Sequence, residues 1–331
     1  MTRKALIIGG TGQIGIATGA ELLRRGWAVT LTHTGRRAPQ NIPAGASLTI
    51  LDRNDTPALR SALGSGVDAL IDTMAFRGKD AEQLIGLRDL FGRHAVISSA
   101  SVYEDDSGRS IETAGTLGLP EFAGPREEDD PVVAPGPESY SSAKVELERA
   151  LFDTPVQGSI IRPCAIHGIN SKHPREWWFV KRMLDGRRLI PLAGNADGRF
   201  HTSATVNIAA IIATALDQPG QHILNAGDPD PPSIREIGEI IAAQLGWTGE
   251  FVPVPADSPI GHTPFSVPHD FTVSMTAAEK FGYRPSATYA EALVPYLAWM
   301  KANAADWRTA FPMFAHYPSD PFDYAAEDSV L

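Results

Sequence analysis

The chain has 331 residues, of which 43% are hydrophobic and 21% charged, and its formal net charge is −10. This composition is ordinary for a globular protein of one large domain or two smaller ones. The acidic balance argues against nucleic-acid and anionic-membrane partners, and no apolar run reaches membrane-spanning length. The single cysteine, Cys164, excludes an internal disulfide framework. The first residues lack a signal-peptide pattern, so we expect a cytoplasmic protein.

The first predicted strand runs directly into a glycine-rich turn. An apolar run ends at Ile8, four glycines follow, and a helical run begins at Ile16. Glycine permits unusual backbone angles and lets a pyrophosphate approach the helix N-terminus, where free N–H groups favour an anion. This is the context of a dinucleotide-binding turn, although an ordinary βαβ turn is the alternative. The predicted cofactor-binding residues here are Gly9, Thr11, Gly12, Gln13, Ile14 and Gly15.

The end of the second predicted strand bears on which cofactor is used. A site that prefers NAD places an acid roughly 20 residues past the glycines, where it bonds the ribose 2′-hydroxyl. Residues 29–37 contain no Asp or Glu. Arg36 and Arg37, with Thr34, are placed to hold a 2′-phosphate through charge-assisted hydrogen bonds. We therefore predict NADP(H) in preference to NAD(H), the alternative being a solvated basic turn.

Short apolar runs alternate with helical patterns through the first half of the chain. The predicted strands are Lys4–Ile8, Trp27–Thr32, Ser47–Leu51, Ala69–Asp72, Ala95–Ser98 and Ser159–Arg162. The predicted helices are Thr56–Leu63, Lys79–Phe91, Glu138–Phe152, Arg175–Leu184, Thr205–Leu216, Ile234–Leu245 and Tyr289–Ala302. This order predicts an α/β fold with a Rossmann-type, doubly wound parallel sheet. Ligands then bind at the carboxyl ends of the strands.

Two stretches break this rhythm. Residues 104–138 are rich in Gly, Pro, Asp and Glu, which predicts a long surface excursion. Residues 311–331 carry aromatic residues and prolines with little helical pattern, which suggests a tail that wraps the body or a partner subunit, as in a homodimer. No group of His, Cys, Asp or Glu has metal-ligand spacing, so we expect no metal site.

Tyr140 and Lys144 have the spacing of a catalytic pair. Four residues apart, they lie on one face of the predicted helix. A nearby ammonium lowers the pKa of a phenol from its usual value of about 10. The pair can then exchange a proton with a carbinol or carbonyl oxygen during hydride transfer to or from nicotinamide. The same spacing also arises by chance on solvated helices.

Together, residues 9–15, read as Gly-Gly-Thr-Gly-Gln-Ile-Gly, and the Tyr140–Lys144 pair resemble the extended short-chain dehydrogenase/reductases, the NAD(P)-dependent epimerase/dehydratase family. Residues 98–103 are similar to the family's Ser-Ser-x-x-Val-Tyr motif, which implies that Ser99 is the catalytic hydroxyl, with Ser98 as the nearest alternative. The surface excursion after this motif, residues 104–138, would then lie near the entrance to the substrate site.

The same resemblance extends to cofactor and substrate residues. Asp52 and Arg53 resemble the family's adenine-contacting pair, and an exposed turn is the alternative. Residues 162–168 resemble Arg-Pro-x-x-x-Tyr-Gly, which implies that Pro163 lines the nicotinamide pocket. The resemblance also implies a role for Lys144 on the nicotinamide ribose. The residues expected to contact substrate are Ser101, His167, for which a structural role is at least as reasonable, and Arg199, which resembles a pyrophosphate-binding arginine.

The resemblance implies an NAD(P)-dependent oxidoreductase that acts on a small molecule. Sugar dehydratases of the family carry Thr-Asp-Glu where residues 99–101 read Ser-Ala-Ser, which disfavours dehydration here. A reductase or a nucleotide-sugar epimerase with retained NAD remains. A non-catalytic protein, or an RNA-binding one similar to chloroplast stem-loop-binding relatives, is the alternative from another class. We expect a Rossmann domain over residues 1–165, to which 195–228 could return, and a smaller substrate domain with a C-terminal tail over 166–331.

Overall fold

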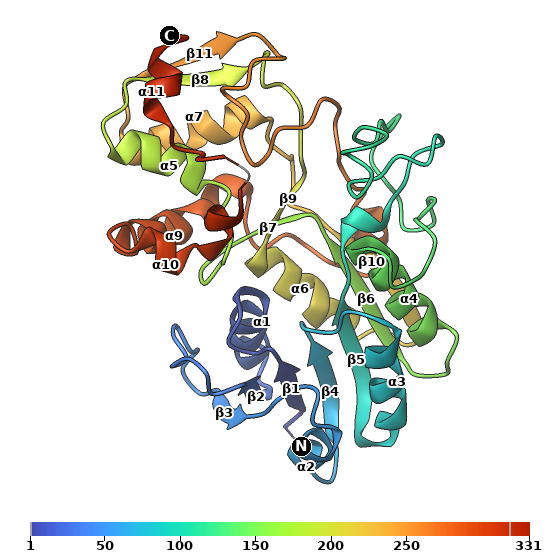
Figure 1. The fold of residues 1–331 in the computed structure, drawn as a ribbon. Helices are drawn as coiled ribbons and strands as arrows, with labels where there is room; N and C mark the ends of the chain where they lie inside the picture. The colour runs from blue at the N-terminus through green and yellow to red at the C-terminus, as the bar shows by residue number, and fades with distance from the viewer. Residues whose placement is uncertain (1, 318) are drawn as a thin grey trace.

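The protein is described by a computed structural model that covers residues 2–317 and 319–331. Its centre is a seven-stranded sheet in the order β10-β6-β5-β4-β1-β2-β3, in which every neighbouring pair is parallel (Figure 1). The strands are β1 Lys4–Ile8, β2 Ala28–His33, β3 Ser47–Ile50, β4 Val67–Asp72, β5 Phe91–Ile97, β6 Gly158–Pro163 and β10 Gln221–Ala226. The predicted Rossmann-type parallel sheet is confirmed.

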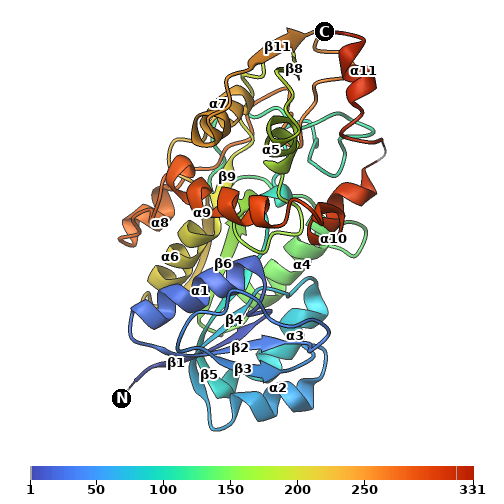
Figure 2. The same cartoon turned by 90° about the vertical axis from the view of Figure 1, so that its left-hand side faces the viewer.

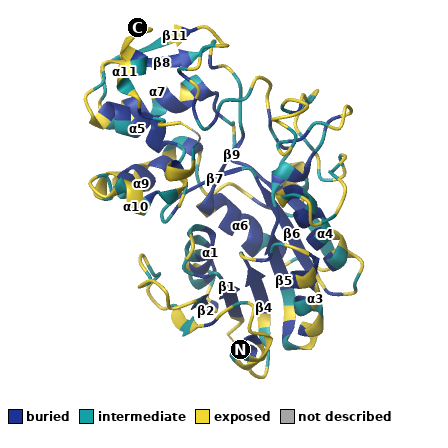
Figure 3. Ribbon diagram, in the orientation of Figure 1, coloured by how far each residue is buried: buried dark blue, intermediate teal, exposed yellow. Residues whose placement is uncertain are grey.

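Helices cover both faces of this sheet. Their bounds are α1 Gln13–Arg24, α2 Thr56–Leu63, α3 Gly78–Gly86, α4 Tyr140–Phe152 and α6 Thr205–Ala215. Alternate residues of β1 enter two different cores, because successive side chains of a strand point to opposite faces. Ala5 and Ile7 pack with the side of α1 and α6, whereas Leu6 and Ile8 pack with the side of α2, α3 and α4. Burial on both faces explains why the central strands β1 and β4 are mainly apolar (Figure 3).

A second lobe lies over the carboxyl ends of the strands (Figures 1 and 2). Its elements are α5 Trp177–Leu184, β8 Leu189–Ala193, α7 Ile234–Leu245, β11 Glu250–Val254, α9 Tyr289–Ala302, α10 Trp307–Ala310 and α11 Tyr324–Asp328. The core of this lobe is rich in aromatic residues, among them Trp177, Phe179 and Phe311. A short parallel pair, β7 Ala165–His167 with β9 Thr202–Ala204, lies where the chain passes between the sheet and this lobe. The remaining short helix, α8 Thr276–Lys280, contacts β10.

Several elements differ from the sequence-based prediction. The helix expected to reach Phe91 ends at Gly86, because Phe91 pairs with Val67 and so begins β5. Strands β7 to β11 were not predicted. These strands are short or half-exposed, and their sequences show little alternation of apolar and polar residues. The tail also contains α11, whose start is capped by Asp323 accepting from the N–H of Ala326.

Residues 104–138 contain neither a helix nor a strand and lie at the surface beside α4 (Figure 1). Their only regular pairings are isolated bridges, such as Tyr103 with Val132. Within the described ranges 2–317 and 319–331, no helix combines the length and apolar character needed to cross a bilayer.

Candidate active site

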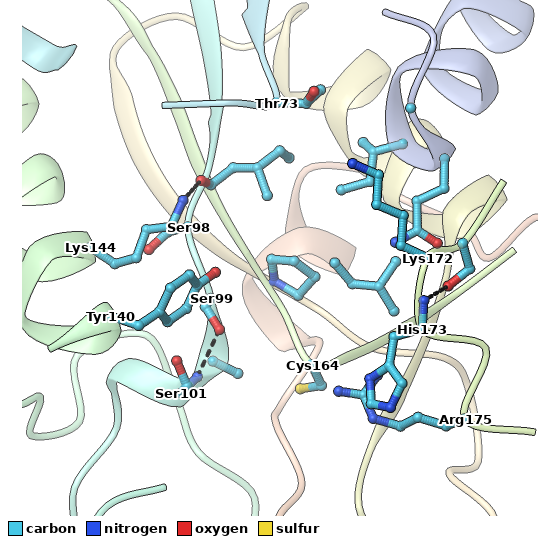
Figure 4. Close-up of a pocket in the computed structure, with 18 of the residues that line it drawn as sticks. Thr73, Ser98, Ser99, Ser101, Tyr140, Lys144, Cys164, Lys172, His173 and Arg175 are labelled. Atoms are coloured by element: carbon cyan, nitrogen blue, oxygen red, sulfur yellow. Dashed lines mark hydrogen bonds between the residues drawn. The ribbon is translucent and has the colours of Figure 1, made fainter. Parts of the chain in front are cut away.

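A cavity of about 580 Å³ opens at the carboxyl ends of β1, β4, β5 and β6. One wall comes from the glycine turn and from the ends of these strands, and the start of α4 adds Tyr140 and Lys144. The loop between β7 and α5 forms the opposite wall (Figure 4). This is where a doubly wound sheet is expected to bind its ligand.

The glycine turn leaves room for a phosphate group. Gly9 has a φ of +69°, and a Cβ there would lie 2.5 Å from Thr73 Oγ1. Gly12 precedes α1 without any side-chain cap, so the first N–H groups of the helix remain free for an anion. Gln13 and Ile14 face the cavity, and the buried Oε1 of Gln13 has no hydrogen-bond partner within residues 2–317 and 319–331. These residues fit the diphosphate of a dinucleotide.

Gly15 has a packing role in the turn. A Cβ on Gly15 would lie 2.6 Å from Gly10 Cα, so glycine lets α1 approach the turn closely. Thr11 and Gly15 do not border the cavity. At the end of β6, Pro163 does border the cavity, next to Cys164, and its role at the nicotinamide stays a prediction. Burial and Asp228 raise the pKa of the Cys164 thiol, which makes it a poor nucleophile.

Ser99, Tyr140 and Lys144 converge in the cavity, as the sequence predicted (Figure 4). Tyr140 is the first residue of α4, which Ser139 caps by accepting from the N–H of Ser142. Burial raises the pKa of Tyr140, an effect that the nearby Ser99 hydroxyl only partly offsets. Ser99 Oγ also accepts from the N–H of Ser101 at 3.1 Å. Ser98 also borders the cavity, and its buried Oγ has no hydrogen-bond partner in the described part of the chain.

Lys144 is buried and lies beside Tyr140. Its Nζ is 5.6 Å from the centroid of the Tyr140 ring and donates to Ala75 O at 2.7 Å and Ile97 O at 2.8 Å. Burial lowers the pKa of Lys144 to about 8, although the carboxylates of Asp72, Glu148 and Asp80 act in the opposite direction. The ammonium thus lies beside the Tyr140 ring, although burial keeps the pKa of Tyr140 itself above its usual value.

A carboxylate from the surface excursion enters the same wall. Glu112 Oε1 accepts from Ser141 Oγ at 3.0 Å, and the hydroxyl groups of Ser141 and Ser101 are also in hydrogen-bond contact at 2.9 Å. Ser101, predicted to contact substrate, and Glu112 both border the cavity. Sequence reasoning placed the excursion near the substrate mouth, but nothing in the sequence singled out Glu112 among its many acids.

Two predicted substrate residues lie outside this cavity. His167 is 2% exposed, and its Nε2 lies 2.7 Å from Asp228 Oδ2, which is the structural role considered as the alternative. Arg199 Nη1 donates to Pro231 O at 2.7 Å and to Glu236 Oε2 at 2.8 Å, and the residue borders a different hollow. The expectation that Arg199 contacts substrate is therefore not supported, because its guanidinium is held by the second lobe.

The residues expected around the adenosine end lie on two surface turns. Arg53 forms ion pairs with Asp72 at 2.8 Å and Asp80 at 2.9 Å, so its guanidinium joins the turn after β3 to β4 and α3 rather than standing free for adenine. Asp52 is exposed, and hydrogen bonds from Asn54, together with Arg36, lower the pKa of its carboxyl. The basic turn after β2, with Thr34, Arg36 and Arg37, is also exposed.

The wall opposite Tyr140 is basic, which sequence reasoning missed. Lys172, His173 and Arg175 come from the loop before α5 and point toward the cavity (Figure 4). Burial and the nearby Arg175 lower the pKa of His173 to about 4, so this histidine is neutral near pH 7. A short Lys-His-Pro-Arg run was the available signal. No group of three potential metal ligands occurs among residues 2–317 and 319–331.

Comparisons with known proteins agree with this geometry. A sequence model of the NAD dependent epimerase/dehydratase family matches residues 5–227. Chloroplast stem-loop binding protein of 41 kDa b from Arabidopsis thaliana is 29% identical over 206 residues, which are 58% of this chain and 50% of that protein. This chain thus spans about half the length of that relative.

Two further likenesses cover nearly the whole chain. UDP-N-acetyl-alpha-D-glucosaminuronate decarboxylase from Bacillus cytotoxicus is 24% identical, with 91% of this chain and 98% of the decarboxylase covered. The structure of UDP-glucose 4-epimerase from Thermus thermophilus in complex with NAD superposes with a TM-score of 0.66 at 18% identity, covering 90% of this chain and 99% of the epimerase. The family match includes the glycine turn, Ser99, Tyr140 and Lys144, and the chain therefore belongs to the NAD dependent epimerase/dehydratase family of enzymes.

Proposed function

We propose that the protein oxidises and reduces a carbinol carbon of a small-molecule substrate, with Tyr140 as the group that exchanges the proton. The observation that carries this proposal is the convergence of Ser99, Tyr140 and Lys144 with the open glycine turn in one cavity. In this proposal residues 1–165, with 195–228, hold the cofactor, and the rest of the chain mainly holds the substrate.

When bound, nicotinamide supplies the hydride acceptor or donor at the reacting carbon. Tyr140 Oη takes the proton of the carbinol as it becomes a carbonyl and returns it in the reverse direction. Ser99 Oγ, which borders the cavity beside Tyr140, donates to the same reacting oxygen and orients it. Lys144 lowers the cost of charging Tyr140, because its ammonium lies beside the phenol ring.

We further propose that the substrate is a nucleotide sugar and that Ser101 contacts it. The decarboxylase and the epimerase reported above carry such substrates in their names, and their likeness extends over the second lobe. Ala100 stands where a dehydratase of this family carries an acid, which supports a reductase or epimerase over a dehydratase. An epimerase regenerates its cofactor in each turnover and should retain it through purification, whereas a reductase exchanges its cofactor in each turnover. Cofactor content after purification therefore distinguishes the two.

For the cofactor, we propose a preference for NADP(H). Arg36 and Arg37 are exposed on the turn after β2, and neither forms an ion pair within the described ranges. Residues 29–37 contain no acid that would repel a 2′-phosphate. Family members bind NAD as well, as the Thermus epimerase structure does, so the basic turn alone supports this preference.

The experiment that tests the proposed function compares Tyr140→Phe with the parent. Tyr140→Phe keeps the ring and removes only the titrating oxygen, so it should bind cofactor normally and lose turnover of nucleotide sugars. Ser99→Ala should slow turnover less, because it removes one orienting hydrogen bond. Ser98→Ala serves as the matched control. Full activity in Tyr140→Phe would refute the acid–base role, and a defect in Ser98→Ala but not Ser99→Ala would transfer the orienting role to Ser98.

RNA binding is the second candidate function, and the 29% identity to the stem-loop binding protein favours it. The net charge of −10 opposes it, since nonspecific affinity for RNA comes mainly from basic side chains. Gel-shift titration with a stem-loop RNA at physiological salt, alongside cofactor turnover, separates the two functions.

A further inference from the structure

Arg175 points into the cavity without a counterion. Its guanidinium forms no hydrogen bond or ion pair with any residue of the ranges 2–317 and 319–331, and its Cζ lies 5.8 Å from the centroid of the Phe200 ring. The fully buried arginines of this chain behave differently. Arg162, for example, reaches Glu148 at 2.6 Å. A guanidinium has five N–H donors, and those of Arg175 are not engaged by the described residues, so they remain available to a ligand in the cavity.

The neighbouring carboxylate does not neutralise Arg175. Glu176 follows it in the chain but is buried, and its Oε1 accepts from Tyr289 Oη at 3.4 Å. Burial lowers the pKa of Arg175, and Glu176 only partly offsets that effect. No ion pair joins the two side chains in the described structure. The charge of Arg175 is thus directed at the space in the cavity.

A second cation strengthens this side of the cavity. Lys172, three residues earlier in the same loop, also borders the cavity, and its Nζ has no hydrogen bond or ion pair with the described residues. The acidic residue that lines the cavity, Glu112, lies on the wall opposite Arg175, where it contacts Ser141. Two uncompensated positive charges in a protein of net charge −10 mark a local site for an anion.

We propose that Arg175 binds an anionic group of the substrate, and that this group is a carboxylate carried by the sugar ring. This proposal rests on the proposed function for the presence of a sugar. Arg175 lies beside Cys164, which follows Pro163 at the nicotinamide end of the cavity, and it faces the wall that carries Ser99 and Tyr140 (Figure 4). An anion held there is close to the reacting carbon. The planar fork of arginine matches a carboxylate with two parallel bonds.

The alternative source of an anion is the diphosphate that joins a sugar to its nucleoside. A diphosphate is common to acidic and neutral nucleotide sugars, whereas a ring carboxylate belongs to acidic sugars alone. Arg175 as a carboxylate ligand therefore sets specificity between the two kinds of substrate. Arg175 as a diphosphate ligand would contribute equally to both.

The test is a calorimetric titration of UDP-glucuronic acid and UDP-glucose into the full-length protein with saturating cofactor. The protein carries Tyr140→Phe so that bound ligand is not consumed. The parent should bind UDP-glucuronic acid more tightly. Adding Arg175→Gln should weaken that binding about tenfold to a hundredfold, the range expected for a hydrogen-bonded charge, and change UDP-glucose binding less than about threefold. Arg175→Lys should recover part of the loss.

Arg188→Gln is the matched control, because Arg188 is exposed on the second lobe away from this cavity. It should leave both affinities unchanged. Equal weakening of both ligands by Arg175→Gln would assign Arg175 to the diphosphate and overturn the carboxylate. A parent protein with no preference for the acidic sugar, or an Arg175→Gln protein that binds both as the parent does, would also overturn it.

Turnover in the protein with Tyr140 intact gives an independent readout. Absence of any product from either sugar, together with Arg175-dependent selectivity for the acid, would refute the proposed redox function and leave the anion site. Turnover of UDP-glucose without selectivity for the acidic sugar would support the proposed redox function and refute the carboxylate site at Arg175.

Discussion

Asn41 Nδ2 donates a hydrogen bond of 2.8 Å to Asn170 Oδ1, which joins two loops separated by 129 residues. Asn41 belongs to the loop after β2, which carries Arg36 and Arg37. Asn170 belongs to the loop after β7, which borders the cavity and leads to Arg175. Asn170 Nδ2 also donates to Gln40 O at 3.4 Å. The two loops therefore meet across the side of the site where the adenosine end of a dinucleotide is expected.

Asn41→Ala should speed release of the bound cofactor. Loss of one neutral hydrogen bond corresponds to about 0.5–1.5 kcal/mol, or roughly a twofold to tenfold faster release. Stopped-flow displacement of the reduced cofactor, followed by its fluorescence, measures this rate. Asn303→Ala, at the end of α9, is the control and should release at the parent rate. An unchanged rate in Asn41→Ala would show that the loops do not restrain the cofactor.

Cofactor affinity should fall as the pH rises through about 8. Burial lowers the pKa of Lys144 to about 8, so its ammonium is present below that pH and is progressively lost above it. A charged donor bonds a ribose hydroxyl more strongly than a neutral amine, by about 1 kcal/mol, which is roughly fivefold in affinity. Titrations between pH 6.5 and 9.5 check the profile. Lys144→Met should bind weakly and show no such transition, and a flat profile in the parent would contradict the assignment.

Replacing Arg36 and Arg37 together with alanine should weaken NADPH by about tenfold or more and NADH very little. Both guanidinium groups are exposed and unpaired in the described structure, so they are available to a 2′-phosphate. The difference between the two cofactors should shrink as salt rises, because exposed charges are screened. Fluorescence titration of NADPH and NADH into the parent and the double variant measures the four affinities. Equal weakening of both, or a parent that prefers NADH, would mean that the turn is only a solvated basic surface.

Glu148→Ala should lower the free energy of unfolding by about 3–5 kcal/mol, since it leaves the charge of Arg162 buried without a counterion. Arg162 is 2% exposed and lies 2.6 Å from Glu148, which joins β6 to the helix that carries Tyr140 and Lys144. Denaturant titration gives the value. Glu82→Ala on the exposed side of α3 should change stability by less than about 0.5 kcal/mol. An equal loss of stability in Glu148→Ala and Glu82→Ala would show that the ion pair between Glu148 and Arg162 contributes no more than an exposed residue does.

The sequence alone determined six of the seven strands of the sheet, all but β10, and the family. Strands β1 to β6 were predicted to within a few residues, because each is an apolar run bounded by a glycine, a helix pattern or a polar end. The glycine turn and the Tyr140–Lys144 spacing are local patterns that need no distant partner. They led to the Rossmann-type sheet and the epimerase/dehydratase family, both of which are confirmed. The roles of the individual site residues stay predictions.

Only the tertiary structure decided which distant residues face the site. The sequence does not distinguish Arg199 from Arg175. In the structure, Glu236 and Pro231 hold Arg199 outside the cavity, whereas Arg175 enters the cavity without a partner among the described residues. Glu112 reaches Ser141 from 29 residues away, and Arg53 is taken up by Asp72 and Asp80. These outcomes depend on contacts between segments far apart along the chain. Local spacing does not encode which side chain meets a counterion and which is left to bind a ligand.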